Sequence, residues 1–288
     1  MKSVSGRGLR GPVSSARRAA MVAAVAVVTV VVAVAAAAVA WAGLAPDEVE
    51  ISTPVYEVST PEKRDSERFV FSFNWSGIPV GRVSMTVADS GFGPGRRLSL
   101  STQGRTNAVV DLLWKYRMDF SGAVTLEPFA PSEFFSREQE NRRHKTTSIK
   151  FSRGPEARIE SVVTKGERRE EFSFAAGNTL DILSTVLLML ELDYFVGEQY
   201  YFDVLTGKSR YLVIAGVEAR ELIEVAGKTE DAYRLLIETS DLTDPDDDGK
   251  HRATHLWVSA ERPRHLLRAV SKTFIGSVYV ELVAVEQP

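Results

Sequence analysis

Much of the chain alternates large apolar side chains with smaller or polar ones, at a period of two residues. The clearest example is RFVFSFNW (68–75), where Phe69, Phe71, Phe73 and Trp75 occupy alternate positions. A period of two places such residues on one face of a β-strand. The pattern therefore predicts a strand here, with one strongly apolar face.

The same pattern predicts strands along most of the chain. After the turn SGIP, the stretch VGRVSMTVA (80–88) predicts the partner of the first strand. Further strands are expected in KTTSIKFS (145–152), ARIESVVTK (157–165), SRYLVIAGVEARELIEVA (209–226), TEDAYRLLIETS (229–240) and FIGSVYVELVAVE (274–286). Gly, Pro or basic residues separate them, as is typical of turns.

Two stretches depart from this period. NAVVDLLWKY (107–116) favours a short helix. GNTLDILSTVLLMLELDYF (177–195) is mostly apolar from Leu180 to Leu192, and Asn178 or Thr179 could cap it. An apolar run of this length favours a helix over a strand, and apolar residues around most of its circumference indicate burial.

These elements predict a mainly β fold: a single large curved antiparallel sheet or open barrel with one inserted apolar helix. A sheet of ten or more strands tends to curl or close, and the helix could fill its concave face. The predicted β-rich domain covers residues 67–288, which is long enough to bury one sizeable core.

The N-terminal region predicts export. The first 20 residues carry five basic side chains and no acid, and Met21 to Ala40 carry no charge at all. Residues 1–42 are therefore a signal peptide cleaved after Ala42, or a retained membrane anchor; both alternatives stay open. Residues 43–66 hold Pro46, Pro54 and Pro61 and predict a flexible tether. The expected location is the periplasm or the outer face of the cytoplasmic membrane, with the membrane as partner through the N-terminal segment.

Composition excludes several classes of function. The chain has no cysteine, which excludes disulfides, thiol catalysis and thiolate metal sites. Without the five basic residues of the leader, the chain has 30 basic and 38 acidic residues, a net charge of −8. A surface of this sign offers no platform for nucleic acid.

One acidic stretch suggests a metal. In SDLTDPDDDGK, Asp244, Asp246 and Asp248 alternate and precede Gly249, as at the start of a calcium loop. Position twelve of such a loop should be a bidentate Glu, but here it is His255. Calcium binding and a solvated acidic turn are both open interpretations; no other cofactor is expected.

No catalytic motif stands out, and we expect a protein that is not an enzyme. Ser184 lies in the apolar helix with no G-x-S-x-G turn around it. His251 and His255 have zinc-like spacing, but along a strand they lie about 13 Å apart.

Apolar residues on the helix and the aromatic strands could instead line a ligand cavity. The candidates are Leu183, Leu187, Phe71, Phe73 and Trp75. The alternative is that the same residues simply pack as a filled core.

The order of several segments resembles a known family. These segments are NWSGIPVGRVSMTV, LEPFAPSEF, NTLDILSTVLLML, GEQYYFDVLTGKSRYLVIAGVEARE and HLWVSAERPRHLLR. Over roughly residues 68 to 286 the chain is similar to domain-of-unknown-function family 3108 of exported bacterial envelope proteins. The resemblance implies an envelope location and a curved β architecture, and supplies no catalytic residues.

The sequence thus predicts a non-enzymatic cell-envelope protein that binds an apolar or lipid-like ligand in a curved sheet. The alternative is an envelope scaffold or assembly factor that acts through protein–protein contacts.

Overall fold

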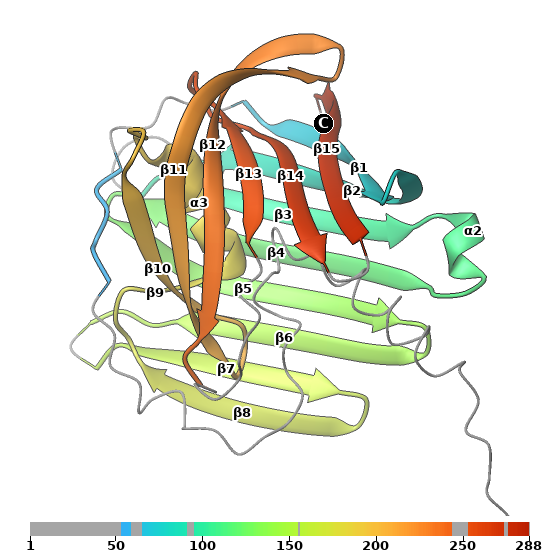
Figure 1. Cartoon of the computed structure of the whole chain (residues 1–288). Helices are drawn as coiled ribbons and strands as arrows, with labels where there is room; N and C mark the ends of the chain where they lie inside the picture. The colour runs from blue at the N-terminus through green and yellow to red at the C-terminus, as the bar shows by residue number, and fades with distance from the viewer. Residues whose placement is uncertain are drawn as a thin grey trace, which may run out of the picture.

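A computed structural model of the chain describes residues 53–58, 65–90, 95–154, 156–243, 253–273 and 276–287. In these residues, fifteen strands form one strongly curved sheet around helix α3 (Figure 1). The first group of strands is β1 (Glu67–Trp75), β2 (Ile78–Ser90), β3 (Arg97–Thr106), β4 (Tyr116–Leu126), β5 (Phe129–Glu140), β6 (Arg143–Phe151), β7 (Arg158–Lys165) and β8 (Arg168–Ala175). The second group is β9 (Thr179–Asp181), β10 (Gln199–Leu205), β11 (Arg210–Val225), β12 (Lys228–Asp241), β13 (Thr254–Ser259), β14 (Leu266–Thr273) and β15 (Gly276–Glu286). The helices are α2 (Ala108–Asp111) and α3 (Ile182–Glu191).

The first and last strands are neighbours in the middle of the sheet. From β1, successive hairpins lead outward to the edge strand β8, and β15 to β10 lead outward on the other side to the edge strand β9. The edges β8 and β9 do not pair, so the sheet is not closed. The prediction of one large curved sheet is confirmed.

The expectation of a purely antiparallel sheet is wrong at one pair of strands. β9 pairs with β10 in parallel, with Thr179 opposite Asp203. The chain leaves β8, crosses to the opposite edge and reaches β10 only after helix α3. A helical crossover is the usual connection between parallel strands.

The inner face of the sheet carries the core. In β3 every second residue is buried, from Leu98 and Leu100 to Thr106. Neighbouring strands continue this layer across the register, because Met85 lies opposite Phe69 and Thr102 lies opposite Phe120. The period of two in the sequence therefore becomes the inside and outside of the curved sheet.

Helix α3 is shorter than the sequence predicts, because its first residues join the sheet. The expected cap at Asn178 or Thr179 is wrong: Asp181 caps the helix and accepts hydrogen bonds from the backbone N–H groups of Leu183 (2.9 Å) and Ser184 (3.0 Å). Every residue of the helix except Val186 is buried. Neither helix in the described part of the chain has the length and apolar character needed to span a bilayer.

A glycine on strand β4 allows helix α3 to pack closely against the sheet. A Cβ atom at Gly122 on β4 would lie 3.2 Å from Cβ of Leu183. The β10–β11 turn, in the second group of strands, closely approaches β7 in the first group. A Cβ atom at Gly207 in this turn would lie 2.8 Å from Cγ2 of Val163. Side-chain packing, rather than backbone pairing, thus brings the two sides together.

Residues 53–58 lie within the predicted flexible tether, yet they pack on the body of the protein. The Tyr56 hydroxyl accepts a hydrogen bond from the backbone N–H of Tyr201 (2.7 Å), and the Asn178 side chain donates to the carbonyl of Thr53 (2.8 Å). We call residues 53–58 the strap. The predicted leader, residues 1–42, lies outside the described residues.

Candidate functional site

The β3–β4 hairpin exposes an unusual number of apolar side chains at its tip. Val109, Leu112 and Leu113 are 75%, 85% and 91% exposed, and Ile78 in the neighbouring β1–β2 hairpin is 61% exposed. Single exposed apolar residues are ordinary, but a contiguous group marks an interaction surface. No other described segment exposes three large apolar residues within five positions.

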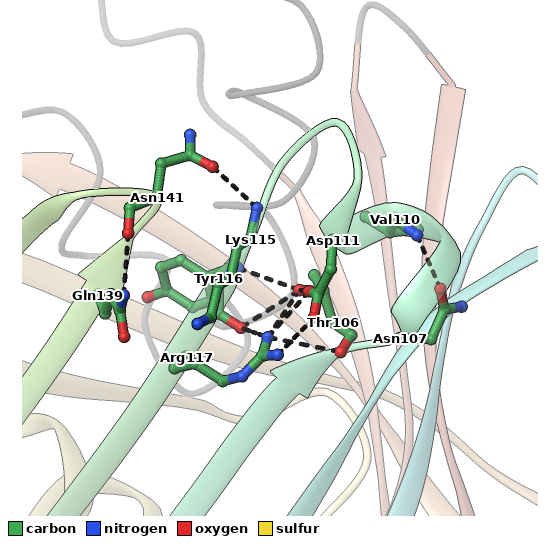
Figure 2. Close-up of polar contacts among 9 residues, drawn as sticks. All are labelled: Thr106, Asn107, Val110, Asp111, Lys115, Tyr116, Arg117, Gln139 and Asn141. Carbon is green, nitrogen blue, oxygen red and sulfur yellow. Dashed lines mark hydrogen bonds and ion pairs between the residues drawn. The ribbon is translucent and has the colours of Figure 1, made fainter.

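A polar network holds this tip rigid (Figure 2). The Arg117 guanidinium binds both carboxylate oxygens of Asp111, at 3.0 and 2.5 Å, and the hydroxyl of buried Thr106 donates to the same carboxylate. The Thr106 hydroxyl also accepts from the backbone N–H of Tyr116 (3.0 Å). The Arg117 and Thr106 hydrogen bonds lower the pKa of Asp111 to about 2, so the carboxylate is ionised at neutral pH.

Two asparagines fasten the tip to the hairpins on either side. Asn107 caps α2 through the N–H of Val110 (2.9 Å) and donates to the carbonyl of Pro79 (2.7 Å), beside Ile78. Asn141, in the β5–β6 turn, accepts from the N–H of Lys115 (2.9 Å), as Figure 2 shows. Three consecutive hairpins therefore form one connected surface.

Basic side chains flank the apolar residues, while the acids beside them are paired. Lys115, Arg142 and Arg143 are exposed, and none has an ion pair within the described residues. Glu138 binds Lys145 and the Tyr116 hydroxyl, both at 3.1 Å, and Glu140 accepts from the Trp114 indole N–H. We call the surface made by Ile78, Val109, Leu112, Leu113, Lys115, Arg142 and Arg143 the α2 platform.

The residues predicted to line a ligand cavity are not among those that line the cleft found in the described part of the chain. Phe71, Phe73, Leu183 and Leu187 are all buried in one hydrophobic core. Trp75 is half-buried at its edge. The structure thus brings four of the five residues into one core and packs Trp75 against it.

A small cleft does lie at the seam between the two sides of the sheet. Its volume is about 110 Å³, and it is bounded by the strap, the start of β5, β9, β10 and α3. Leu180, Leu188 and Phe202 form its apolar floor, while Asn178 and Thr179 supply polar groups. Pockets for drug-sized ligands are about 300–1,000 Å³, so this cleft could take only a small group or the end of a chain.

One buried acid has a perturbed pKa. Complete burial raises the pKa of Asp181 to about 6, although hydrogen bonds from Ser184 and Leu183 oppose the shift. A perturbed carboxyl in a cleft would be a catalytic candidate. Asp181 is 0% exposed and does not line the seam cleft, so its role is to cap α3.

The predicted calcium residues Asp244, Asp246 and Asp248 lie outside the described residues, and calcium binding stays a hypothesis. Among the described residues, no group of three His, Asp or Glu side chains could hold a metal ion. His255, on β13, contacts Glu218 at 3.3 Å instead.

The family model of a protein of unknown function, DUF3108, matches residues 70–283. The chain belongs to this family. Membership confirms the resemblance seen in the sequence but brings no assigned activity. The comparison with curated proteins found no match.

Solved structures support the fold. A β-barrel-like protein of family DUF1849 from Brucella abortus superposes with a TM-score of 0.50 and 12% identity, covering 77% of this chain and 97% of that one. At this identity the likeness concerns the fold alone. A putative exported protein from Bacteroides fragilis has a TM-score of 0.36 and 6% identity over 80% of this chain and all of that one, too low for any argument.

Reasoning from the sequence did not find the α2 platform. It predicted the short helix, but took Val109, Leu112 and Leu113 as ordinary apolar positions. Two features of the sequence could have indicated this surface: the asparagines Asn107 and Asn141, and the interruption of the period of two between two predicted strands.

Proposed function

We propose that the protein is an exported, non-enzymatic component of the cell envelope that acts by docking its α2 platform on another envelope component. The basic, then apolar, N-terminal sequence supports export, because this pattern directs a chain out of the cytoplasm. The docking role is a form of the contact-based function that the sequence left as an alternative.

The observation that carries this proposal is the rigid exposure of Val109, Leu112 and Leu113. Exposed apolar surface costs free energy in water, and a mobile loop could fold such residues inward. Here the bidentate Asp111–Arg117 pair and the Asn107 cap hold the backbone that presents them. A pre-ordered surface of this kind loses less entropy on binding.

Site-specific photocrosslinking in producing cells tests the proposal. A photoreactive residue at Leu113 should give a discrete product, and Leu112→Ser should abolish it. Leu222, which is 71% exposed in β11, is the matched control position and should give none. Equal products from both positions, or none from Leu113, would reject docking through the platform.

A second candidate function is binding of a small apolar group in the seam cleft. The cleft itself favours it, since its floor reaches Leu188 of the buried helix. This candidate keeps the predicted binding of an apolar ligand but places it in the seam cleft instead of at the centre of the sheet. Native mass spectrometry of the isolated chain should show an adduct that Ala130→Phe, which fills the cleft, removes and that Ala176→Phe, at an exposed position, retains.

A further inference from the structure

We infer that the partner of the α2 platform is the surface of a lipid bilayer that contains anionic phospholipid. This inference rests on the proposed docking function and names its partner. It follows from three features of the platform: its apolar tip, its unpaired basic residues and the aromatic pair behind them.

The apolar residues have the arrangement of a shallow membrane anchor. Val109 lies in the four-residue helix α2, and the exposed Leu112 and Leu113 follow it directly; this end of the β3–β4 hairpin lies at the periphery of the molecule in Figure 1. A projecting tip of this kind enters the boundary between head groups and acyl chains more readily than it fits a flat protein surface.

The charges match an anionic surface. Asp111 is paired with Arg117 and Glu138 with Lys145, whereas Glu140 accepts from the neutral indole N–H of Trp114 and keeps its charge. Within the described residues, Lys115, Arg142 and Arg143 have no ion pair, so three positive charges stand against the one negative charge of Glu140. This local sign contrasts with the net −8 expected for the chain without its leader, and basic residues next to an apolar tip strengthen binding to anionic lipid.

An aromatic pair lies behind the tip: Trp114 is half-buried, and Tyr116 packs against the hydrophobic core. Trp114 stacks on Tyr116 with ring centroids 5.3 Å apart, directly behind the exposed leucines in the sequence. Their polar atoms bind Glu140 and Glu138, so each ring is anchored at one end. Tryptophan and tyrosine are enriched at the head-group depth of membranes because one end is apolar and the other polar.

Depth-dependent fluorescence quenching tests the inference with the full-length chain, whose own N-terminal segment also has affinity for lipid. The readout must therefore be local. The chain has no cysteine, so Leu113→Cys and Leu222→Cys each give a single labelling position. Each labelled chain is reconstituted in vesicles of phosphatidylcholine with or without phosphatidylglycerol, carrying quencher-labelled acyl chains.

The label at position 113 should be quenched in vesicles with phosphatidylglycerol, and the label at position 222, near the opposite end of the sheet, should not. Replacing Arg142 and Arg143 by Gln should raise the lipid concentration needed for half-maximal quenching at position 113 about 25-fold, since each basic residue adds about a factor of five. Both are exposed, so the variant should unfold at the same temperature as the parent.

No quenching at position 113, or equal quenching at both positions, would overturn the bilayer as partner. The photocrosslinking described above separates the two proposals. A Leu113 product with an envelope protein, together with no quenching in protein-free vesicles, would leave docking in place and reject lipid. Absence of both would reject docking and its partner together.

Discussion

Asp181 shows how much one residue contributes to this fold. Its carboxylate begins the buried helix, and its backbone ends strand β9, so it joins the two elements that the sequence treated as one. The sequence placed this cap at Asn178 or Thr179 rather than at Asp181. It could not reveal the full burial of the carboxyl, because burial depends on the strands packed around it.

The raised pKa of Asp181 makes stability depend on pH. Its folded pKa, about 6, exceeds the ordinary 3.8, so between these values the folded state binds more protons than the unfolded state. The free energy of unfolding should therefore fall as pH rises from about 4 to 6, by about 2–3 kcal/mol, and stay lower above that. Denaturant unfolding at several pH values measures this decline.

Two variants make the test specific. Asp181→Asn should lose the decline in that window, because no carboxyl titrates there. Ser184→Ala should retain it and extend it to higher pH, since the Ser184 hydroxyl bond favours the ionised form. Identical pH profiles for the parent and Asp181→Asn would show that another group controls stability.

Gly81 supports a second prediction at the residue scale. A Cβ atom there would lie 2.4 Å from the carbonyl oxygen of Arg105, and this oxygen belongs to the backbone of β3. Gly81→Ala should therefore lower the free energy of unfolding by about 1–3 kcal/mol, as overpacking generally does. Gly177→Ala, which meets nothing within 4 Å, is the matched control in thermal unfolding and should be neutral. Equal melting temperatures for both variants would contradict the close approach.

At the scale of elements, the sequence predicted most strands correctly because each has one apolar and one polar face. The long strand β11 and the short helix α2 both appear where the pattern placed them. Helix α3 was predicted at the correct place, but with extra residues at its N-terminal end. The segment from Thr179 to Asp181 is too short to show a period, and only pairing with β10 makes it a strand.

The polar network of the β3–β4 hairpin gives a prediction for that element. Asp111→Asn should remove the ion pair with Arg117, so amide hydrogens from 106 to 117 should exchange faster while the rest of the sheet is unchanged. The loss of overall stability should stay within about 1 kcal/mol, because the pair is partly exposed.

Asp231→Asn is the control for this hairpin. It breaks a comparable pair, Arg220–Asp231 at 2.6 Å, in the β11–β12 hairpin. Exchange at the α2 tip should not respond to it. A tip that exchanges equally in both variants and the parent would mean that Asn107 and Asn141 alone hold the platform.

At the scale of the whole molecule, the sequence predicted the curved sheet and the inserted helix but not how the sheet ends. Pairing of β1 with β15, more than two hundred residues apart, leaves no local trace in the sequence. Nor does the crossing from β8 to β9, which leaves the sheet open. The strap was missed for a similar reason: the prolines of residues 43–66 indicated a tether, and only the distant Tyr201 and Asn178 give residues 53–58 a place to bind.

The final prediction concerns the strap. Tyr56 packs on Tyr200 and Phe202 at ring-centroid distances of 5.7 and 5.5 Å, and its hydroxyl accepts from the N–H of Tyr201. Tyr56→Phe removes only the hydroxyl, so the Tyr201 amide should exchange faster with about 1 kcal/mol lost in stability. Tyr56→Ala also removes the ring, and should cost about 1–3 kcal/mol because the ring is half-buried.

The same pair of variants decides whether the strap covers the seam. If it does, Tyr56→Ala should also speed exchange in the amides of α3 next to Leu188, whereas Tyr56→Phe should not, because the ring still covers the cleft. Glu57→Ala is the control, since Glu57 is exposed in the strap and does not line the cleft, so it should change neither. Exchange in α3 that is equal in all four chains would mean that the seam closes without the strap, through the packing of α3 against β4 and β5 alone.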